Sequence, residues 1–120
     1  MAQAEELTKE LQISFRETVP PGQGILVEDY FAFAGKIIHV MMSFPPGCNN
    51  LVLARLLKDR SPFYPKAGFL ALDNTSPVYP TYIDYYEREP LGFEVQNQDS
   101  VNPHTISCTV VLRYKKPSLS

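Results

Sequence analysis

The chain has 120 residues, a net charge of -2 and 44% hydrophobic residues. This length fits one domain, and the composition is too apolar and too weakly charged for a disordered chain. No apolar run approaches the ~20 residues of a membrane span, and 11 basic against 13 acidic residues give no electrostatic pull toward nucleic acid or anionic lipid. We therefore expect neither nucleic acid nor a membrane as a partner.

The N-terminal stretch favours a helix over residues 2–11, because Ala, Glu, Leu and Lys are good helix formers. Leu7 and Leu11 are spaced i, i+4 and share one face. Such a short helix is not stable alone, so residues 1–11 are predicted to be an arm that docks in assembly, with a tail as the alternative. The stretch lacks the basic and apolar regions of a signal peptide, which predicts synthesis in the cytoplasm.

From Ile13 onward the apolar pattern changes to period two, which is typical of strands. Turn clusters rich in proline separate the segments. The chain has 11 prolines, and their share of the residues is about twice the ~5% of an average protein. Pro80 restricts its segment to a sheet edge or splits it. We predict strands around Ile13 and Phe15 and over 25–34, 36–44, 51–57, 67–72, 78–86, 91–96 and 104–114.

Strands at intervals of about ten to twelve residues without helices between them predict an all-β fold. We expect an eight-stranded antiparallel β-sandwich over residues 12–116, either a jelly roll or another Greek key, followed by a short tail at 117–120. The chain has no Trp, which argues against the immunoglobulin-like variant of the sandwich.

The two cysteines, Cys48 and Cys108, are sixty positions apart. Cys108 is in phase with apolar neighbours, which predicts a buried free thiol. Cys48 follows a turn, and a disulfide between the two forms only if the fold brings them together.

The segment from Phe93 to His104 resembles the cupredoxin segment in which a strand ends in Asn-x-Asp and a Pro-His turn supplies a copper ligand. The matching residues are Phe93, Val95, Asn97, Asp99, Pro103 and His104. Cupredoxins take their remaining ligands from a later loop, whereas no His or Met follows His104 here. The resemblance therefore implies a Greek-key sandwich in which Asn97, Asp99 and His104 fix a turn, and we expect no metal or other cofactor.

No nucleophile motif and no glycine-rich phosphate loop occurs, so we expect no enzymatic activity. The aromatic residues are concentrated between positions 63 and 86, and Tyr is favoured at interfaces because its ring is apolar and its hydroxyl hydrogen-bonds. They are interpreted as a subunit interface, a platform for glycans or a cap on the core. The residues concerned are Phe63, Tyr64, Tyr79, Tyr82, Tyr85 and Tyr86.

In size and predicted architecture the whole chain resembles small single-domain jelly-roll or sandwich proteins that build or decorate virus and phage particles. This resemblance implies a structural subunit that associates with itself and with other particle proteins, in a virion. The alternative is a module that binds carbohydrate or another ligand through the aromatic segment 63–86. A small metal protein of the cupredoxin or cupin type is disfavoured by the missing ligands.

Overall fold

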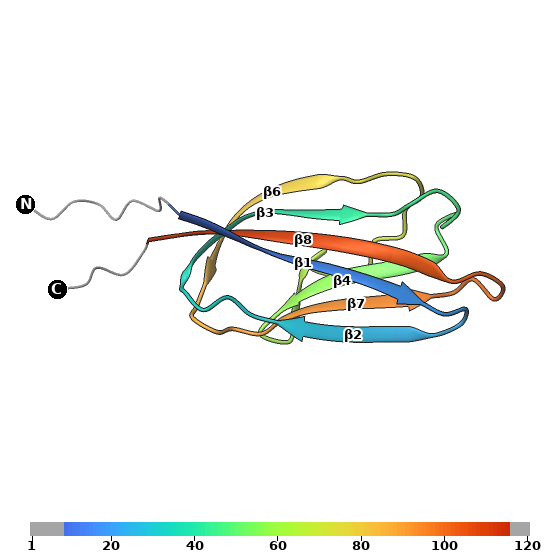
Figure 1. Cartoon of the computed structure of the whole chain (residues 1–120), viewed down its shortest axis with the longest axis horizontal. Coiled ribbons are helices and arrows are strands. Elements are labelled where there is room, and N and C mark those ends of the chain that lie inside the picture. The colour runs from blue at the N-terminus through green and yellow to red at the C-terminus, as the bar shows by residue number, and fades with distance from the viewer. Residues whose placement is uncertain (1–8, 116–120) are drawn as a thin grey trace, which may run out of the picture.

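The computed structural model describes residues 9–115, and these form eight antiparallel strands in two four-stranded sheets. Figure 1 shows the strands running along the length of a flattened sandwich. The described residues include no helix long and apolar enough to cross a membrane. The strands are β1 (Lys9–Val19), β2 (Gly24–Asp29), β3 (Gly35–Ser43), β4 (Val52–Lys58), β5 (Ser61–Tyr64), β6 (Val78–Tyr85), β7 (Leu91–Asn97) and β8 (His104–Tyr114).

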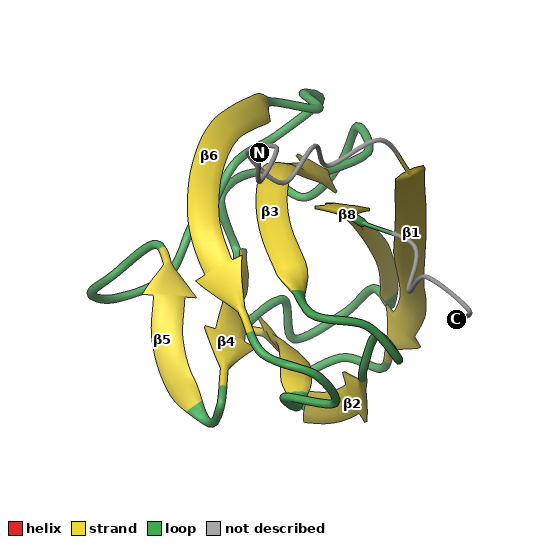
Figure 2. Cartoon of the chain, turned by 90° about the vertical axis from the view of Figure 1, so that its left-hand side faces the viewer, coloured by secondary structure: helices red, strands yellow, loops and turns green. Residues whose placement is uncertain are grey.

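The strand order is β1-β8-β3-β6 in the first sheet and β2-β7-β4-β5 in the second. Four of the six hydrogen-bonded pairs are nested in sequence: β1 with β8, β2 with β7, β3 with β6 and β4 with β5. The pairs of β3 with β8 and of β4 with β7 complete the two sheets. Figure 2 looks along the sandwich and shows β1 and β2 at one side and β5 and β6 at the other. Each sheet therefore has two edge strands, and the edges of the two sheets coincide.

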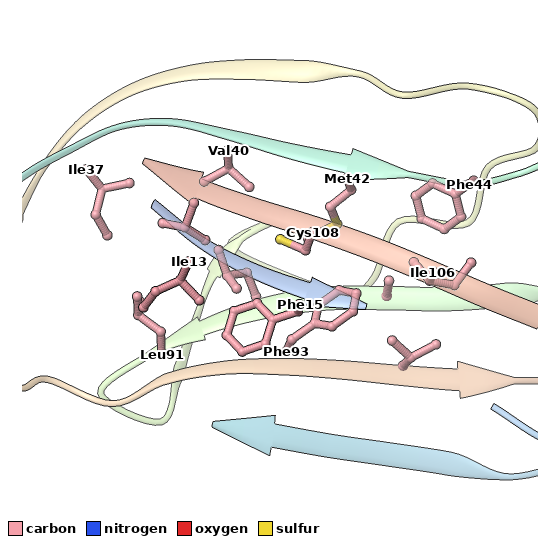
Figure 3. Packing of buried hydrophobic residues seen from close by; sticks show 14 of the residues in the cluster. Ile13, Phe15, Ile37, Val40, Met42, Phe44, Leu91, Phe93, Ile106 and Cys108 are labelled. Carbon is pink, nitrogen blue, oxygen red and sulfur yellow. The ribbon is translucent and has the colours of Figure 1, made fainter. Parts of the chain in front are cut away.

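The core lies between the sheets and takes every second residue of the central strands. Strand β8 illustrates this alternation, because its buried side chains at Ile106, Cys108 and Val110 alternate with partly exposed Ser107 and Thr109. Figure 3 shows side chains from both sheets meeting in this layer, where the rings of Phe15 and Phe93 stack with centroids 5.5 Å apart. The predicted all-β sandwich of eight strands is confirmed.

The prediction of a helix over residues 2–11 is wrong at positions 9–11, which begin β1, and the rest of that segment lies outside the described residues. The sheet boundary is accordingly at Lys9 and not at residue 12. Lys9 pairs with Tyr114 and Leu11 with Leu112, in a ladder that continues without a break to Val19. Cross-strand hydrogen bonds and side-chain pairs along β8 outweigh the helix propensity of three residues.

Two other strand boundaries also differ from the prediction. The fifth strand is β5 at 61–64, which was predicted to be a loop, whereas 67–72 contributes only a single bridge between Leu70 and Ala54. The predicted strand 25–34 ends at Asp29. Asp29 accepts a hydrogen bond from the Tyr30 N–H, which ends the ladder in a turn.

Both cysteines are free and buried. Burial alone raises the pKa of Cys108 to about 12, so this thiol is an apolar core side chain at neutral pH. The prediction of a buried free thiol at Cys108 is confirmed.

The first testable prediction concerns Gly35, which lies between β6 and β8 at the start of β3. A Cβ atom at Gly35 would collide with the Arg113 carbonyl oxygen and lie 3.0 Å from the Tyr114 Cβ. We expect Gly35→Ala to lower the free energy of unfolding by ~2 kcal/mol or more in urea denaturation, because two backbones must separate.

Gly24→Ala is the matched control, because a Cβ there meets its nearest neighbour at an ordinary 3.4 Å. Its stability should stay within about 1 kcal/mol of the wild type. Equal losses in the two variants would contradict the close approach at Gly35.

Candidate functional site

Asn97, the last residue of β7, joins two loops at one end of the sandwich through its side chain. The Asn97 amide NH2 donates to the carbonyl oxygens of Val19 and Asn102, both at 3.0 Å, and to that of Pro20 at 3.3 Å. Its side-chain oxygen accepts the Asp99 N–H at 2.9 Å. Asn97 is buried, so these bonds replace water and hold the β1–β2 and β7–β8 loops together.

Asp99 and His104 form the second half of this cluster. One carboxylate oxygen of Asp99 accepts the backbone N–H groups of Val101 and Asn102, and the other lies 2.8 Å from His104 Nε2. The hydrogen bond to His104 and the two backbone N–H groups hold the pKa of Asp99 at about 2, below its ordinary 3.8. The carboxylate is therefore ionised at neutral pH and fixes both the turn and the ring.

The opposite ring nitrogen, His104 Nδ1, lies 3.9 Å from the sulfur of Cys48 in the β3–β4 loop. Cys48, His104 and Asp99 thus stand in the order of a nucleophile, a base and an orienting acid. The thiol, however, is fully buried, and burial together with the nearby Asp73 carboxylate raises its pKa. Because the thiolate is the nucleophile, this geometry favours a structural role for Cys48.

The six aromatic residues between 63 and 86 do not form one surface. Tyr85 is only 1% exposed, and its hydroxyl donates to the Glu89 carbonyl oxygen at 2.6 Å and accepts the Phe31 N–H at 2.8 Å. Tyr85 therefore belongs to the core. Phe63 and Tyr64 pack partly against the core, and the Tyr64 ring lies 4.0 Å from that of Tyr79, joining β5 to β6.

Tyr82 and Tyr86 are the two exposed members, at 67% and 65%. The Lys36 ammonium lies 4.9 Å from the centre of the Tyr82 ring and forms an ion pair with Asp84. The Lys58 ammonium lies 5.9 Å from the Tyr86 ring. Each exposed ring is thus paired with a cation from a different sheet, since Lys36 is in β3 and Lys58 in β4.

The outer face of the second sheet carries a hollow of about 500 Å³, which we did not predict. Next to it, the side chains of Leu26 and Leu57 close over Gly92 of β7, where a Cβ atom would lie 3.2 Å from the end of each. The hollow is lined by Leu26, Glu28, Arg55, Leu57, Arg60 and Glu94, with ion pairs Arg55–Glu94 and Arg60–Glu28 at 2.6 and 3.7 Å.

The predicted assembly arm is only partly described. Leu7 lies outside the described residues, and Leu11 lies in β1 with 37% of its surface exposed. β1 has a strand neighbour on one side only, so the backbone groups on its other side are open to pairing. Sequence periodicity alone did not reveal which strands are edges.

No group of three or more His, Cys, Asp or Glu side chains within residues 9–115 is arranged to hold a metal ion. No protein-family model matches the sequence, and a search of curated proteins finds no relative.

The second testable prediction is that Asn97→Ala lowers the free energy of unfolding by roughly 2–4 kcal/mol, because buried carbonyl groups lose their donor. Urea denaturation followed by circular dichroism measures this. Gln98→Ala is the neighbouring control, since the Gln98 side chain is exposed. A loss at Asn97 no larger than the loss at Gln98 would show that the cluster does not hold the loops.

The third prediction follows from the lowered pKa of Asp99. Its contribution to stability is complete above the ordinary pKa of 3.8 and is lost as the pH falls toward about 2, where the folded protein also takes up the proton. Asp99→Asn keeps an acceptor oxygen but does not titrate. The stability difference between wild type and Asp99→Asn should therefore shrink from about pH 5 to about pH 2. A difference that stays constant over this range would disprove the assignment.

Proposed function

We propose that this chain is a non-enzymatic structural subunit, a self-associating jelly roll of the kind that builds or decorates virus and phage particles. The observation that carries the proposal is the nested pairing of β1 with β8, β2 with β7, β3 with β6 and β4 with β5. A long hairpin folded over on itself gives this order, which supports a jelly roll with two Greek keys. Capsid domains are prominent among jelly rolls.

The side chains support assembly over chemistry. Cys48 and His104 are buried, and the raised pKa of the Cys48 thiol makes it a poor nucleophile. The loops at that end are joined by Asn97, which gives a rigid body for packing against neighbours. Fold alone does not determine function, so this proposal depends on the association test below.

A glycan-binding module is the second candidate, and one observation favours it. Tyr82 and Tyr86 present exposed rings, and exposed aromatic rings stack on sugar faces. The Tyr64 and Tyr79 rings already contact each other at a tilt, and Tyr85 is buried. The candidate platform is therefore reduced to two rings from the six aromatic residues.

The fourth prediction is that the purified chain forms a defined oligomer whose population grows with concentration between about 1 and 500 µM. Size-exclusion chromatography with multi-angle light scattering measures the mass of each species. Light scattering with the Tyr82→Ala and Tyr86→Ala variants then tests whether the aromatic rings contribute to association. A strict monomer that binds glycans on an array through Tyr82 and Tyr86 would replace the structural proposal by the second candidate.

A further inference from the structure

The four sheet edges of the sandwich differ in how open they are. β5 has only four residues and contains Pro62, β6 contains Pro80, and β2 has six residues. β1 has eleven residues with no Pro and no Gly, and its pairing with β8 is regular along its whole length. Proline, short length and irregular pairing are the usual devices that block edge-to-edge association. Among the four edge strands within residues 9–115, β1 is the longest, and it lacks the prolines of β5 and β6.

We propose that two copies of the chain associate through β1, in an antiparallel pair centred on Ile13. This inference rests on the proposed self-association and names its surface, symmetry and register. Two identical strands pair antiparallel about a two-fold axis, and residues that face each other must have the same hydrogen-bonding direction. This condition is met only when the two-fold axis passes through a residue, and not when it passes between two residues. Registers of this kind also keep the buried face of each strand on the same side.

The charges of β1 distinguish these registers. With Ile13 facing its own counterpart, every charged residue faces one of opposite sign, and the apolar Leu11 faces the apolar Phe15. Cross-strand pairs of opposite charge and of apolar side chains both stabilise a sheet. The facing pairs are Lys9 with Glu17, Glu10 with Arg16, Leu11 with Phe15 and Gln12 with Ser14, and the two-fold axis forms each pair twice.

The neighbouring register, centred on Ser14, loses this complementarity. It places Leu11 opposite Glu17 and Lys9 opposite Val19, and no charged residue then faces an opposite charge. Charged residues on an edge strand often prevent pairing with another strand. That role does not require positive and negative residues to be placed symmetrically about one position. The arrangement of signs about Ile13 therefore points to a second copy of the same strand as the partner.

The charged side chains of β1 are also available for such a pair. Lys9 and Arg16 are exposed and Glu17 is half-buried, and none of the three forms an ion pair within the described part of the chain. Glu10 bonds Arg113 of β8 at 2.7 Å, which leaves it half-exposed at the edge. The pair of Lys9 with Glu17 is therefore the cleaner one to test.

The experiment uses the two single charge reversals Lys9→Glu and Glu17→Lys in the full chain. Each variant alone places like charges opposite each other at two positions of the proposed pair. We therefore expect its dimer dissociation constant to be about tenfold higher than that of the wild type. An equimolar mixture of the two variants restores Glu opposite Lys at both positions. Sedimentation velocity should then show wild-type-like dimers in the mixture and fewer dimers in each variant alone.

Glu87→Lys is the control for a charge change outside β1, because Glu87 is exposed in the β6–β7 turn. Its dimer should match the wild type. The unfolding midpoint of each variant, measured at the lowest protein concentration, separates loss of pairing from loss of folding. Lys9 and Glu17 form no ion pair with another residue between positions 9 and 115, so the midpoints should stay close to that of the wild type.

A cross-link tests the register separately. Gln12→Cys mixed with Ser14→Cys should form an intermolecular disulfide faster than either variant alone, because those two positions face each other only in the register centred on Ile13. The native Cys48 and Cys108 are buried and give a low background. Rapid cross-linking of Ser14→Cys with itself would indicate the register centred on Ser14 and overturn the proposal.

The outcomes separate the two proposals. A wild-type chain that stays monomeric at all concentrations defeats self-association and the β1 pair together. A wild-type oligomer that neither charge reversal weakens keeps the structural subunit and overturns the β1 interface. Weakening by both reversals without recovery in the mixture would show that charge at β1 matters but that the proposed register is wrong.

Discussion

The pairing of the first strand with the last is the constraint on which the rest of this structure depends. β1 and β8 are aligned over eleven residue pairs, from Lys9 with Tyr114 to Val19 with His104. This ladder joins residues about ninety-five positions apart, such as Ser14 and Thr109, whose hydroxyl oxygens are 3.4 Å apart. Three further pairs, β2 with β7, β3 with β6 and β4 with β5, are nested inside this first pair.

The same nesting determines where the polar cluster lies. It brings the β1–β2 loop, the β3–β4 loop and the β7–β8 loop to one end of the sandwich, where Asn97, Asp99 and His104 join them. These buried groups are satisfied by one another and by backbone groups. A buried polar network of this kind holds loops in one arrangement, because a partly satisfied alternative would leave carbonyl and N–H groups without partners. The cluster thus results from the strand topology and also stabilises it.

The two sides of the sandwich differ in their edge strands. One side of the sandwich presents β1, a long regular edge, whereas the other side is interrupted by Pro62 in β5 and Pro80 in β6. Prolines therefore explain which edge is closed as well as where the turns fall. The two sides of the sandwich therefore differ in how readily their edge strands can pair with another strand.

Much of the fold could be predicted from the sequence. The period-two pattern of residues 104–114 and the proline-rich turns determined an all-β sandwich with eight strands, because apolar alternation and turn chemistry are local properties. The sequence also marked Asn97, Asp99 and His104 as a group. It misplaced the fifth strand and assigned a helix to residues 9–11, because Leu11 has the same helix propensity whether or not β8 lies beside it.

Only the tertiary structure decided which side chains meet and which edges are open. Tyr85 and Tyr82 are three residues apart, yet one lies in the core and the other is exposed, because the side chains of a strand alternate between faces. Strands that are distant in sequence create the proximity of Cys48 to His104, the hollow on the second sheet and the free side of β1. The order of residues along β1, by contrast, is fixed by the sequence alone. The symmetric charges of β1 can bear on strand pairing only because the fold places that strand at an edge, where backbone groups are free to pair.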